Sequence, residues 1–350
     1  MDCMTFINRV SCRRHGKSCL ASERAPLARV AAATLAAMLW STVVVQSAFA
    51  AENFPTRPVR IVVPFPAGGG TDSIARVLAK SFTTDTGQPF VVENRAGASG
   101  NIGLDAIAKS QADGYTIGLT TSNLTMNGAL YKRLAFDPQR DFQPVSLIAS
   151  SPLVIGVSNT LGISALSALR AKAKASGQPL AYSSCGNGTP QHFAGAMLAA
   201  AWNVRFVHVP YKGCAPALVD ALGGQVPIFI STVANALPYS RDPRIGVLAV
   251  TGHDRSRYIP AVPSASEQGV TSLDMRVWFG LIAPNGLPEP VLKRLVALTL
   301  AAMKKPEVRQ ILEAQGYDAV GSDPATFAAT IATEIPFWKQ LAAKYAISLE

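Results

Sequence analysis

The chain has 350 residues, which is enough for about two domains of ordinary size and a large buried core. Its 32 Lys and Arg residues against 22 Asp and Glu give a formal charge of +10, but the basic residues are scattered singly and are not interleaved with aromatic ones. This pattern is typical of a solvated surface with a weak attraction for anions, and it argues against a nucleic-acid-binding stripe.

Residues 1–50 are typical of a cleaved secretory signal peptide. Basic residues are concentrated in residues 1–29, an apolar run follows at residues 30–45, and Ala48-Phe49-Ala50 has the small-x-small pattern of a cleavage site. The apolar run is shorter than the roughly 20 residues of a spanning helix, which argues against a membrane anchor. Cleavage removes six basic and two acidic side chains, so we expect a periplasmic mature chain with a net charge of +6.

Strand and helix patterns alternate in the first part of the mature chain. Residues 59–64 form a short apolar, β-branched run, and apolar residues then recur at helical spacing from Ile74 to Phe82. A strand at 89–94, a helix at 101–109 and a strand at 115–121 follow. This alternation predicts an α/β fold with a parallel sheet and helices on both faces.

A second α/β series begins with a predicted strand at residues 152–157. Its further elements are a helix at 161–174, a strand at 180–184, a helix at 190–202, a strand at 205–209, a helix at 216–222 and strands at 226–231 and 245–250. After a strand at 276–283 the chain turns helical, at 290–303, 306–314 and 324–345, with a kink expected at Pro336.

The three C-terminal helices have no strands of their own to cover, so we expect them to pack on the first sheet. The chain then crosses between lobes near residue 152 and again near residue 275. This predicts lobe 1 from residues 51–151 plus 276–350 and lobe 2 from residues 152–275, with a hinge and a cleft between them.

The glycine-rich segment Ala67-Gly68-Gly69-Gly70 follows the first predicted strand. It lets the backbone turn sharply and approach a ligand, and Thr71 or Asp72 is expected to cap the next helix. The free amides of that turn, together with the helix dipole, favour an anion. The spacing matches neither G-x-x-x-x-G-K-[ST] nor G-x-G-x-x-G, so no nucleotide fingerprint is present, and a tight turn without a ligand is the alternative.

Residues 183–192 repeat this arrangement in the second series. Thr189 is the expected N-cap, and Pro190 occupies the first helical position. His192 falls in the first turn, where it could bind a carboxylate or serve a structural role. No Asp or Glu is placed to make it a catalytic base.

The third loop, at residues 209–224, offers the ring and hydroxyl of Tyr211 and the cation of Lys212, which could contact a ligand or stay solvated. Cys214 lies at the same stage of this loop as Cys185 does in the second, and these are the cysteines left after cleavage. An even pair in an oxidising compartment favours a disulfide, worth roughly 3 to 4 kcal/mol, although two free thiols remain the alternative.

Five segments stand in the order found in one receptor family, namely PFPAGGGTDSIARVLA, VVENRAGASGNIG, SSCGNGTPQHFAGAML, VPYKGCAPALVDALGGQV and GLIAPNGLPEPV. Together they resemble the Bug (TctC-like) periplasmic receptors of tripartite tricarboxylate transporters, over about all of residues 54–350. The resemblance implies a two-lobed Venus flytrap, each lobe a mainly parallel sheet flanked by helices. Such a receptor closes on a small carboxylated solute and docks on a membrane permease.

In that family, main-chain groups and ordered waters from loops of both lobes hold the ligand carboxylate. The matching residues of lobe 1 are Phe65, Ala67, Gly68, Gly69, Thr71 and Asp72, with Ser122 and Asn123 nearby. Those of lobe 2 are Ser184, Gly186, Gly188, Thr189 and His192, with Tyr211 and Lys212 at the rim. Many relatives have other small residues or proline at positions 185 and 214, so a disulfide would belong to this sequence or a subset.

The mature sequence shows no catalytic set. Its histidines, His192, His208 and His253, are widely spaced without metal-ligand periodicity, and no G-x-S-x-G occurs. We therefore expect a monomeric receptor, not an enzyme, without cofactor, metal or nucleic acid. The alternatives are an exported α/β enzyme that uses Asp72 or His192 on a carboxylate, and a sensor that presents the solute to a membrane kinase.

Overall fold

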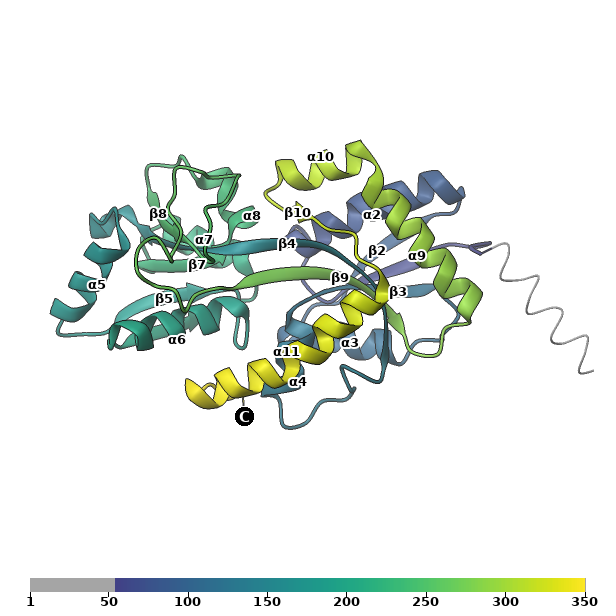
Figure 1. Ribbon diagram of the computed structural model, residues 1–350, viewed down its shortest axis with the longest axis horizontal. Helices are drawn as coiled ribbons and strands as arrows, with labels where there is room; N and C mark the ends of the chain where they lie inside the picture. The colour runs from purple at the N-terminus through teal and green to yellow at the C-terminus, as the bar shows by residue number, and fades with distance from the viewer. Residues whose placement is uncertain (1–53, 350) are drawn as a thin grey trace, which may run out of the picture. The chain divides into compact units, whose positions relative to one another are not determined.

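The computed structural model describes residues 54–349, and the predicted signal peptide at residues 1–50 lies outside them. Residues Asn53–Glu350 form one compact unit. Within the described residues, no helix is both long enough and apolar enough to cross a bilayer. The unit consists of two lobes, each a β-sheet covered by helices, which long strands connect (Figure 1).

The sheet of lobe 1 has the strand order β2–β1–β3–β9–β4. Its strands are β1 (Val59–Val63), β2 (Phe90–Asn94), β3 (Thr116–Thr121), β4 (Phe142–Ser158) and β9 (Arg276–Pro284). Strand β1 is parallel to β2 and β3, whereas β9 is antiparallel to both β3 and β4. A short strand, β10 (Asp318–Ala319), adds one more antiparallel pair to β4.

Strand β4 passes from one lobe into the other. As far as Pro152 it pairs with β9, and beyond Pro152 it pairs with two strands of lobe 2, β7 and β8. The chain returns to lobe 1 at Arg276, where β9 begins. The strands of lobe 2 are β5 (Leu180–Ser184), β6 (Phe206–Pro210), β7 (Ile228–Thr232) and β8 (Ile245–Val250). The strand partners change where the sequence predicts the two crossings, and the lobe boundaries themselves stay a prediction.

Both sheets are mixed. The predicted parallel pairing is present among β1, β2 and β3 and among β5, β6 and β7, but β4, β8 and β9 run antiparallel to their neighbours. The alternation of strands and helices along the chain does not reveal this, because the direction of a strand is defined only against a distant partner.

The sequence patterns miss helix α4, the four-residue helix α8 (Val233–Ala236), the short strand β10 and half of strand β4. Helix α4 (Asn123–Leu130) contains asparagine, threonine and glycine, which are weak helix formers, and all but two of its residues are buried. Strand β4 begins at Phe142, about ten residues before the predicted strand, because Pro144 and several serines interrupt the apolar pattern there. Tertiary burial outweighs local propensity in both segments.

Helices cover both sheets. They are α2 (Gly70–Thr86), α3 (Asn101–Ala108), α4, α5 (Leu166–Ala175), α6 (Pro190–Trp202), α7 (Cys214–Leu222), α8 (Val233–Ala236), α9 (Glu289–Lys304), α10 (Pro306–Ala314) and α11 (Pro324–Lys344). As expected, the C-terminal helices pack on lobe 1: α9 and α11 lie against β4, and α10 lies against α2. Helix α11 is continuous through Pro336, and the kink expected there stays a prediction.

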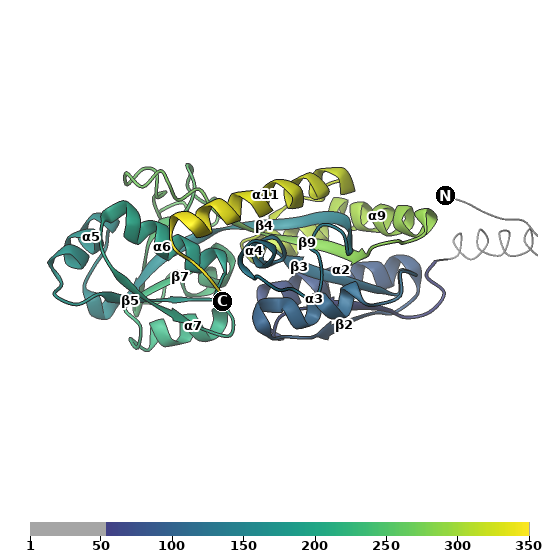
Figure 2. The ribbon, with the colours of Figure 1, turned by 90° about the horizontal axis from the view of Figure 1, so that it is seen from below.

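Helix α11 also reaches lobe 2, which the sequence patterns do not predict. The ring of Trp338 contacts Phe193 of α6 with centroids 5.4 Å apart, and Figure 2 shows α11 running from β9 toward α6. On lobe 1 the helix lies directly on β9, because a Cβ at Gly280 would overlap the ring of buried Phe327. This helix therefore packs on both lobes.

Candidate ligand-binding site

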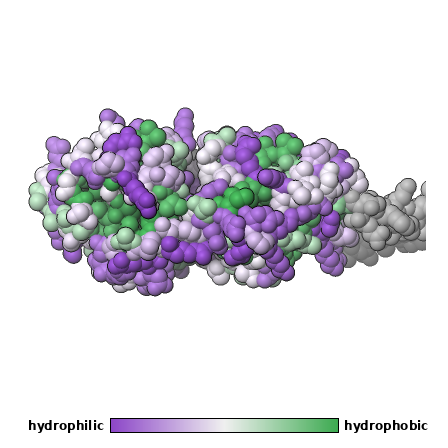
Figure 3. Space-filling view, turned by 90° about the horizontal axis from the view of Figure 1, so that it is seen from above, coloured by the Kyte–Doolittle hydropathy of each residue, from purple (hydrophilic) through white to green (hydrophobic). Residues whose placement is uncertain are grey.

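A pocket of about 190 Å³ lies between the lobes, and residues of both form its walls. Lobe 1 contributes the loop after β1, the loop after β3 and the side chains of Val277 and Phe279 on β9. Lobe 2 contributes the segments that follow β5, β6 and β7. In the space-filling view of Figure 3 the lobes meet at a narrow waist, with apolar surface on both of them.

Five helices begin at this pocket, and each is the next helix after a strand. Helices α2 and α4 come from lobe 1, and α6, α7 and α8 come from lobe 2. The pocket thus lies at the carboxyl ends of strands, where open α/β sheets bind their ligands. The first amides of a helix have no partner within the helix and carry a partial positive charge. Helix termini from two sides therefore make the pocket attractive to an anion.

The glycine-rich loop after β1 is held by Asp72, but not as a helix cap. The N-cap of α2 is Gly69, which corrects the expectation that Thr71 or Asp72 caps this helix. The Asp72 carboxylate accepts hydrogen bonds from the Gly68 amide at 3.0 Å, from Arg76 Nε at 2.9 Å and from Asn94 Nδ2 at 3.0 Å. Burial by itself would raise the pKa of Asp72, but these donors hold it below its usual value. The charged Asp72 side chain therefore stabilises the loop without lining the pocket.

Asn123, at the start of α4, lines the pocket and carries a buried donor that has no hydrogen-bond partner among the described residues. Its side chain lines the pocket and the residue is only 4 % exposed. Its Oδ1 accepts from Thr121 Oγ1 at 3.4 Å, whereas its Nδ2 has no hydrogen-bond partner among the described residues. Buried amide groups are nearly always hydrogen-bonded, so Asn123 keeps one donor available beside the pocket.

The loop after β5 is capped as predicted. Thr189 is the N-cap of α6, its Oγ1 accepts from the His192 amide at 3.3 Å, and Pro190 is the first helical residue. Thr189, Pro190 and Gln191 line the pocket. Across the cleft, Ser99 Oγ of lobe 1 donates to the Asn187 carbonyl at 3.1 Å.

His192 points away from the pocket and into lobe 2. Its ring stacks on His208 with centroids 3.8 Å apart, and its Nδ1 accepts from the Gly188 amide at 3.2 Å. His208 Nε2 lies 2.6 Å from Ser184 Oγ. Burial lowers the pKa of His192 to about 4, and burial together with repulsion from His192 lowers that of His208 to about 3. Both rings are therefore neutral near pH 7. Through their contacts with Gly188 and Ser184 they stabilise the loop after β5.

A disulfide joins the second and third loops of lobe 2. Cys185 and Cys214 are bonded, with Cα atoms 4.2 Å apart, and both line the pocket. Backbone bonds run alongside it, from the Gly213 amide to the Cys185 carbonyl at 3.1 Å and from the Tyr211 amide to the Ser184 carbonyl at 3.2 Å. The disulfide and the backbone bonds together make one wall of the pocket.

Among the described residues that line the pocket, Lys212 alone has a charged side chain. Its neighbour Tyr211 turns away, because its hydroxyl donates to Asp220 Oδ2 at 2.5 Å. Burial and the Asp220 carboxylate raise the pKa of Tyr211 to about 12, so its proton is retained. The electrostatics of the wall therefore combine one lysine cation with helix N-termini.

The chain matches the family described as "Tripartite tricarboxylate transporter family receptor" over residues 74–347. It belongs to this family. It is 36 % identical over 290 residues to protein BugT of Bordetella pertussis, which covers 82 % of this chain and 89 % of BugT.

Two solved structures show the same architecture. The periplasmic binding protein BugD has a TM-score of 0.79 and 32 % identity, covering 84 % of this chain and 99 % of BugD. Rpa4515 of R. palustris with adipate has a TM-score of 0.81 and 32 % identity, with 84 % and 99 % covered. The family resemblance and the two-lobed fold are therefore confirmed, and the chain is a solute-binding receptor.

The structure brings part of the predicted ligand set of this receptor to the pocket. The predicted residues that line it are Phe65, Ala67, Gly69, Thr71, Asn123, Thr189 and Lys212, with Cys185 and Cys214. Those that do not line it are Gly68, Asp72, Ser122, Ser184, Gly186, Gly188, His192 and Tyr211. Contact of any of them with a ligand stays a prediction.

Several of the residues away from the pocket have structural contacts instead. Ser122 is fully buried, and its amide donates to the Trp278 carbonyl at 3.2 Å, although its hydroxyl has no partner among the described residues. Ser184 accepts from the Gly186 amide at 3.2 Å and contacts His208. Gly188 packs between Leu130 and Leu349, where a Cβ would collide with both. Gly68 lies on the far side of the loop, against a neighbouring cavity.

Several pocket residues of this receptor are absent from the predicted ligand set. Thr232 caps α8 through its Oγ1, which accepts from the Asn235 amide at 3.2 Å, and both residues line the pocket. The strand–threonine–helix pattern used for Thr189 would have found them. No such signal exists for Val277 and Phe279, because apolar residues within a strand are typical of a core.

Between residues 54 and 349, no group of three or more His, Cys, Asp or Glu side chains could hold a metal ion. The two residues of the enzyme alternative, Asp72 and His192, both lie outside the pocket lining and are engaged in local hydrogen bonds.

Proposed function

We propose that this receptor captures one small organic carboxylate between its lobes in the periplasm and delivers it to a membrane permease of the tripartite tricarboxylate type. The observation that carries the proposal is the convergence of helix N-termini from both lobes on one pocket, with the unpaired Asn123 donor among them. A carboxylate there would accept from amides of both lobes at once, so its binding would favour closure.

The rest of the lining limits the class of ligand. Much of the wall is apolar, formed by Phe65, Pro66, Pro190, Val277 and Phe279. Lys212 supplies one full positive charge. This composition suits an acid with an apolar body more than a compact polyanion, because several uncompensated charges would be desolvated against apolar side chains.

One solved relative contains a ligand of this kind. The solved structure of Rpa4515 contains adipate, a carboxylate with an aliphatic body. Delivery to a permease follows the role of the family. Within the predicted ligand set, we assign ligand contact to the residues that line the pocket, namely Phe65, Ala67, Gly69, Thr71, Asn123, Thr189 and Lys212.

Calorimetry and thermal unfolding with a panel of mono-, di- and tricarboxylates test the proposal. A ligand at a hundred times its Kd should stabilise the chain by about 2.7 kcal/mol. Mass spectrometry of small molecules released from freshly purified, denatured protein would identify a co-purified ligand. If no acid in the panel binds and none is released, the proposal is wrong.

A matched pair of variants tests the site. In Asn123→Asp the unpaired donor becomes a carboxylate that faces the ligand anion, so affinity should fall by roughly 30-fold or more. The control is Asn203→Asp, which makes the same charge change at an exposed residue after α6, outside the pocket lining. Equal affinities of the two variants would contradict carboxylate capture at Asn123.

The two alternatives are separable by simple assays. Turnover of the bound acid would indicate an enzyme, and membrane partners recovered with the loaded receptor would distinguish a permease from a kinase. A receptor for uptake should return the acid unchanged.

A further inference from the structure

A second cavity, of about 320 Å³, lies next to the pocket; we call it the rear cavity. The two share three lining residues, Gly69, Gly70 and Asn235, so only the start of α2 and the start of α8 separate them. They also meet through a ring contact, since Phe279 of the pocket and Tyr317 of the rear cavity have centroids 5.1 Å apart. The interlobe cleft therefore continues beyond the pocket.

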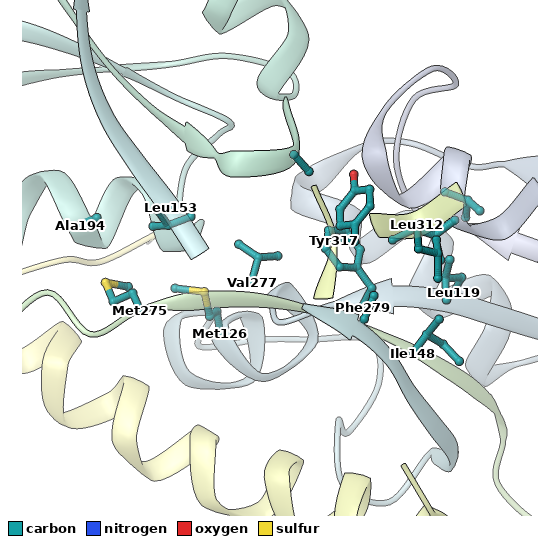
Figure 4. Close-up of a cluster of buried hydrophobic side chains, with 14 of the residues drawn as sticks. Leu119, Met126, Ile148, Leu153, Ala194, Met275, Val277, Phe279, Leu312 and Tyr317 are labelled. Atoms are coloured by element: carbon teal, nitrogen blue, oxygen red, sulfur yellow. The ribbon is translucent and has the colours of Figure 1, made fainter. Parts of the chain in front are cut away.

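Tyr317 presents an unused hydroxyl in the rear cavity. The residue is 2 % exposed, yet its hydroxyl has no hydrogen-bond partner among residues 54–349. Figure 4 shows the Tyr317 ring beside Phe279, with the hydroxyl at the end that points away from β9. The hydroxyl lies at the start of α2, because a Cβ at Gly70 would overlap it.

The position of Tyr317 is held by both lobes. Its ring packs edge-on against Phe279 of lobe 1, and its carbonyl accepts from the Tyr258 hydroxyl of lobe 2 at 2.6 Å. Burial raises the pKa of Tyr317 well above its ordinary value, so the hydroxyl keeps its proton. A protonated hydroxyl without a partner can donate a hydrogen bond to a ligand atom.

The other polar groups of the rear cavity do not use this donor. Ser73 Oγ donates to Gln315 Oε1 at 2.7 Å, and Asn235 Nδ2 donates to Thr232 Oγ1 at 2.9 Å. No charged side chain is part of the lining, which otherwise includes apolar Leu237 and Pro238. Together, the hydroxyl and the N-terminus of α2 suit a ligand oxygen, and nothing in this lining would compensate a cation.

We propose that the rear cavity is a distal subsite, in which the Tyr317 hydroxyl donates a hydrogen bond to an oxygen at the far end of an elongated carboxylate. The inference rests on the proposed function, because the first carboxylate must lie in the pocket. The ligand class is then a linear dicarboxylate long enough to pass between Gly69 and Asn235, or an acid of similar length that ends in an amide.

Tyr317→Phe tests the subsite, with Tyr345→Phe as the control. Tyr345 lines neither cavity. The probes are linear dicarboxylates of increasing length, from succinate to suberate, their half-amides, and straight-chain monocarboxylates of the same lengths, each measured by calorimetry. Tyr317→Phe should lose roughly 5- to 50-fold in affinity for the long two-ended acids and stay within twofold of the unmodified chain for the monocarboxylates.

The outcomes separate the two proposals. If Tyr317→Phe loses the same affinity for half-amides as for dicarboxylates, the subsite recognises any oxygen acceptor. If it loses affinity for dicarboxylates alone, the distal group is an anion. Either result supports the subsite. An unchanged affinity of Tyr317→Phe for every two-ended acid, or an equal loss for monocarboxylates, overturns the subsite alone. If the unmodified chain binds none of the probes, carboxylate binding itself fails. The variant removes one oxygen that has no partner, so its melting temperature should match the control.

Discussion

Removal of the disulfide should cost stability far more than it costs affinity. The perturbation is the double variant Cys185→Ala/Cys214→Ala, which opens a bridge between residues 29 positions apart. In the chain-entropy description, a loop of about 30 residues contributes about 3.6 kcal/mol at 25 °C by restricting the unfolded chain. With the entropy of unfolding typical of a chain of about 300 residues, this corresponds to a fall in Tm of about 6 °C.

The native loops should stay in place without the bridge. The bonds from the Gly213 amide to the Cys185 carbonyl and from the Tyr211 amide to the Ser184 carbonyl join the same two loops independently of sulfur. We therefore expect ligand affinity to change by less than roughly threefold, since the loss falls mainly on the unfolded state.

Urea unfolding and calorimetry on the same samples provide the assay. The unmodified chain with and without a reductant serves as the control, because reduction opens the same loop without a change in sequence. A melting temperature within about 1 °C of the unmodified chain would refute the chain-entropy reasoning. A large loss of affinity at unchanged stability would show instead that the bridge shapes the native pocket.

Two further predictions concern acid stability and helix packing. Because the pKa of His192 is lowered to about 4 and that of His208 to about 3, the unfolded chain binds more protons than the folded one below about pH 6.5. The free energy of unfolding should fall by roughly 1 to 3 kcal/mol as the pH drops from 6.5 toward 4, after allowance for partial exposure of the two rings. The double variant His192→Gln/His208→Gln should lose less stability over this range. Comparison of the urea midpoints of the two proteins at pH 7 and pH 4.5 measures the difference. Gly280→Ala should lower the free energy of unfolding by about 1 to 3 kcal/mol, because the new Cβ overlaps the Phe327 ring. Adding Phe327→Leu should relieve part of that loss. If the effects of the two substitutions on stability are additive, direct packing of α11 on β9 is contradicted.

Local patterns in the sequence determined the strand-to-helix loops and their chemistry. Thr189 before Pro190 predicted the cap of α6, because capping depends on residues within one turn of the helix. The glycines after β1 predicted a loop that could approach a ligand, and Asn123 was placed among the ligand residues by family resemblance. The cap and the glycine-rich loop depend on neighbours in the chain, so the order of residues was sufficient to predict them, whereas Asn123 required the comparison with a known family.

Only the tertiary structure decided which groups face the cleft. Asp72 turns toward Arg76 and Asn94, and His192 turns toward His208, although either could have faced a ligand as judged from the sequence. Val277 and Phe279 line the pocket because β9 pairs with β4 where the chain passes between lobes. The direction of a side chain depends on partners more than a hundred positions away in the case of β9, and no local pattern carries that information.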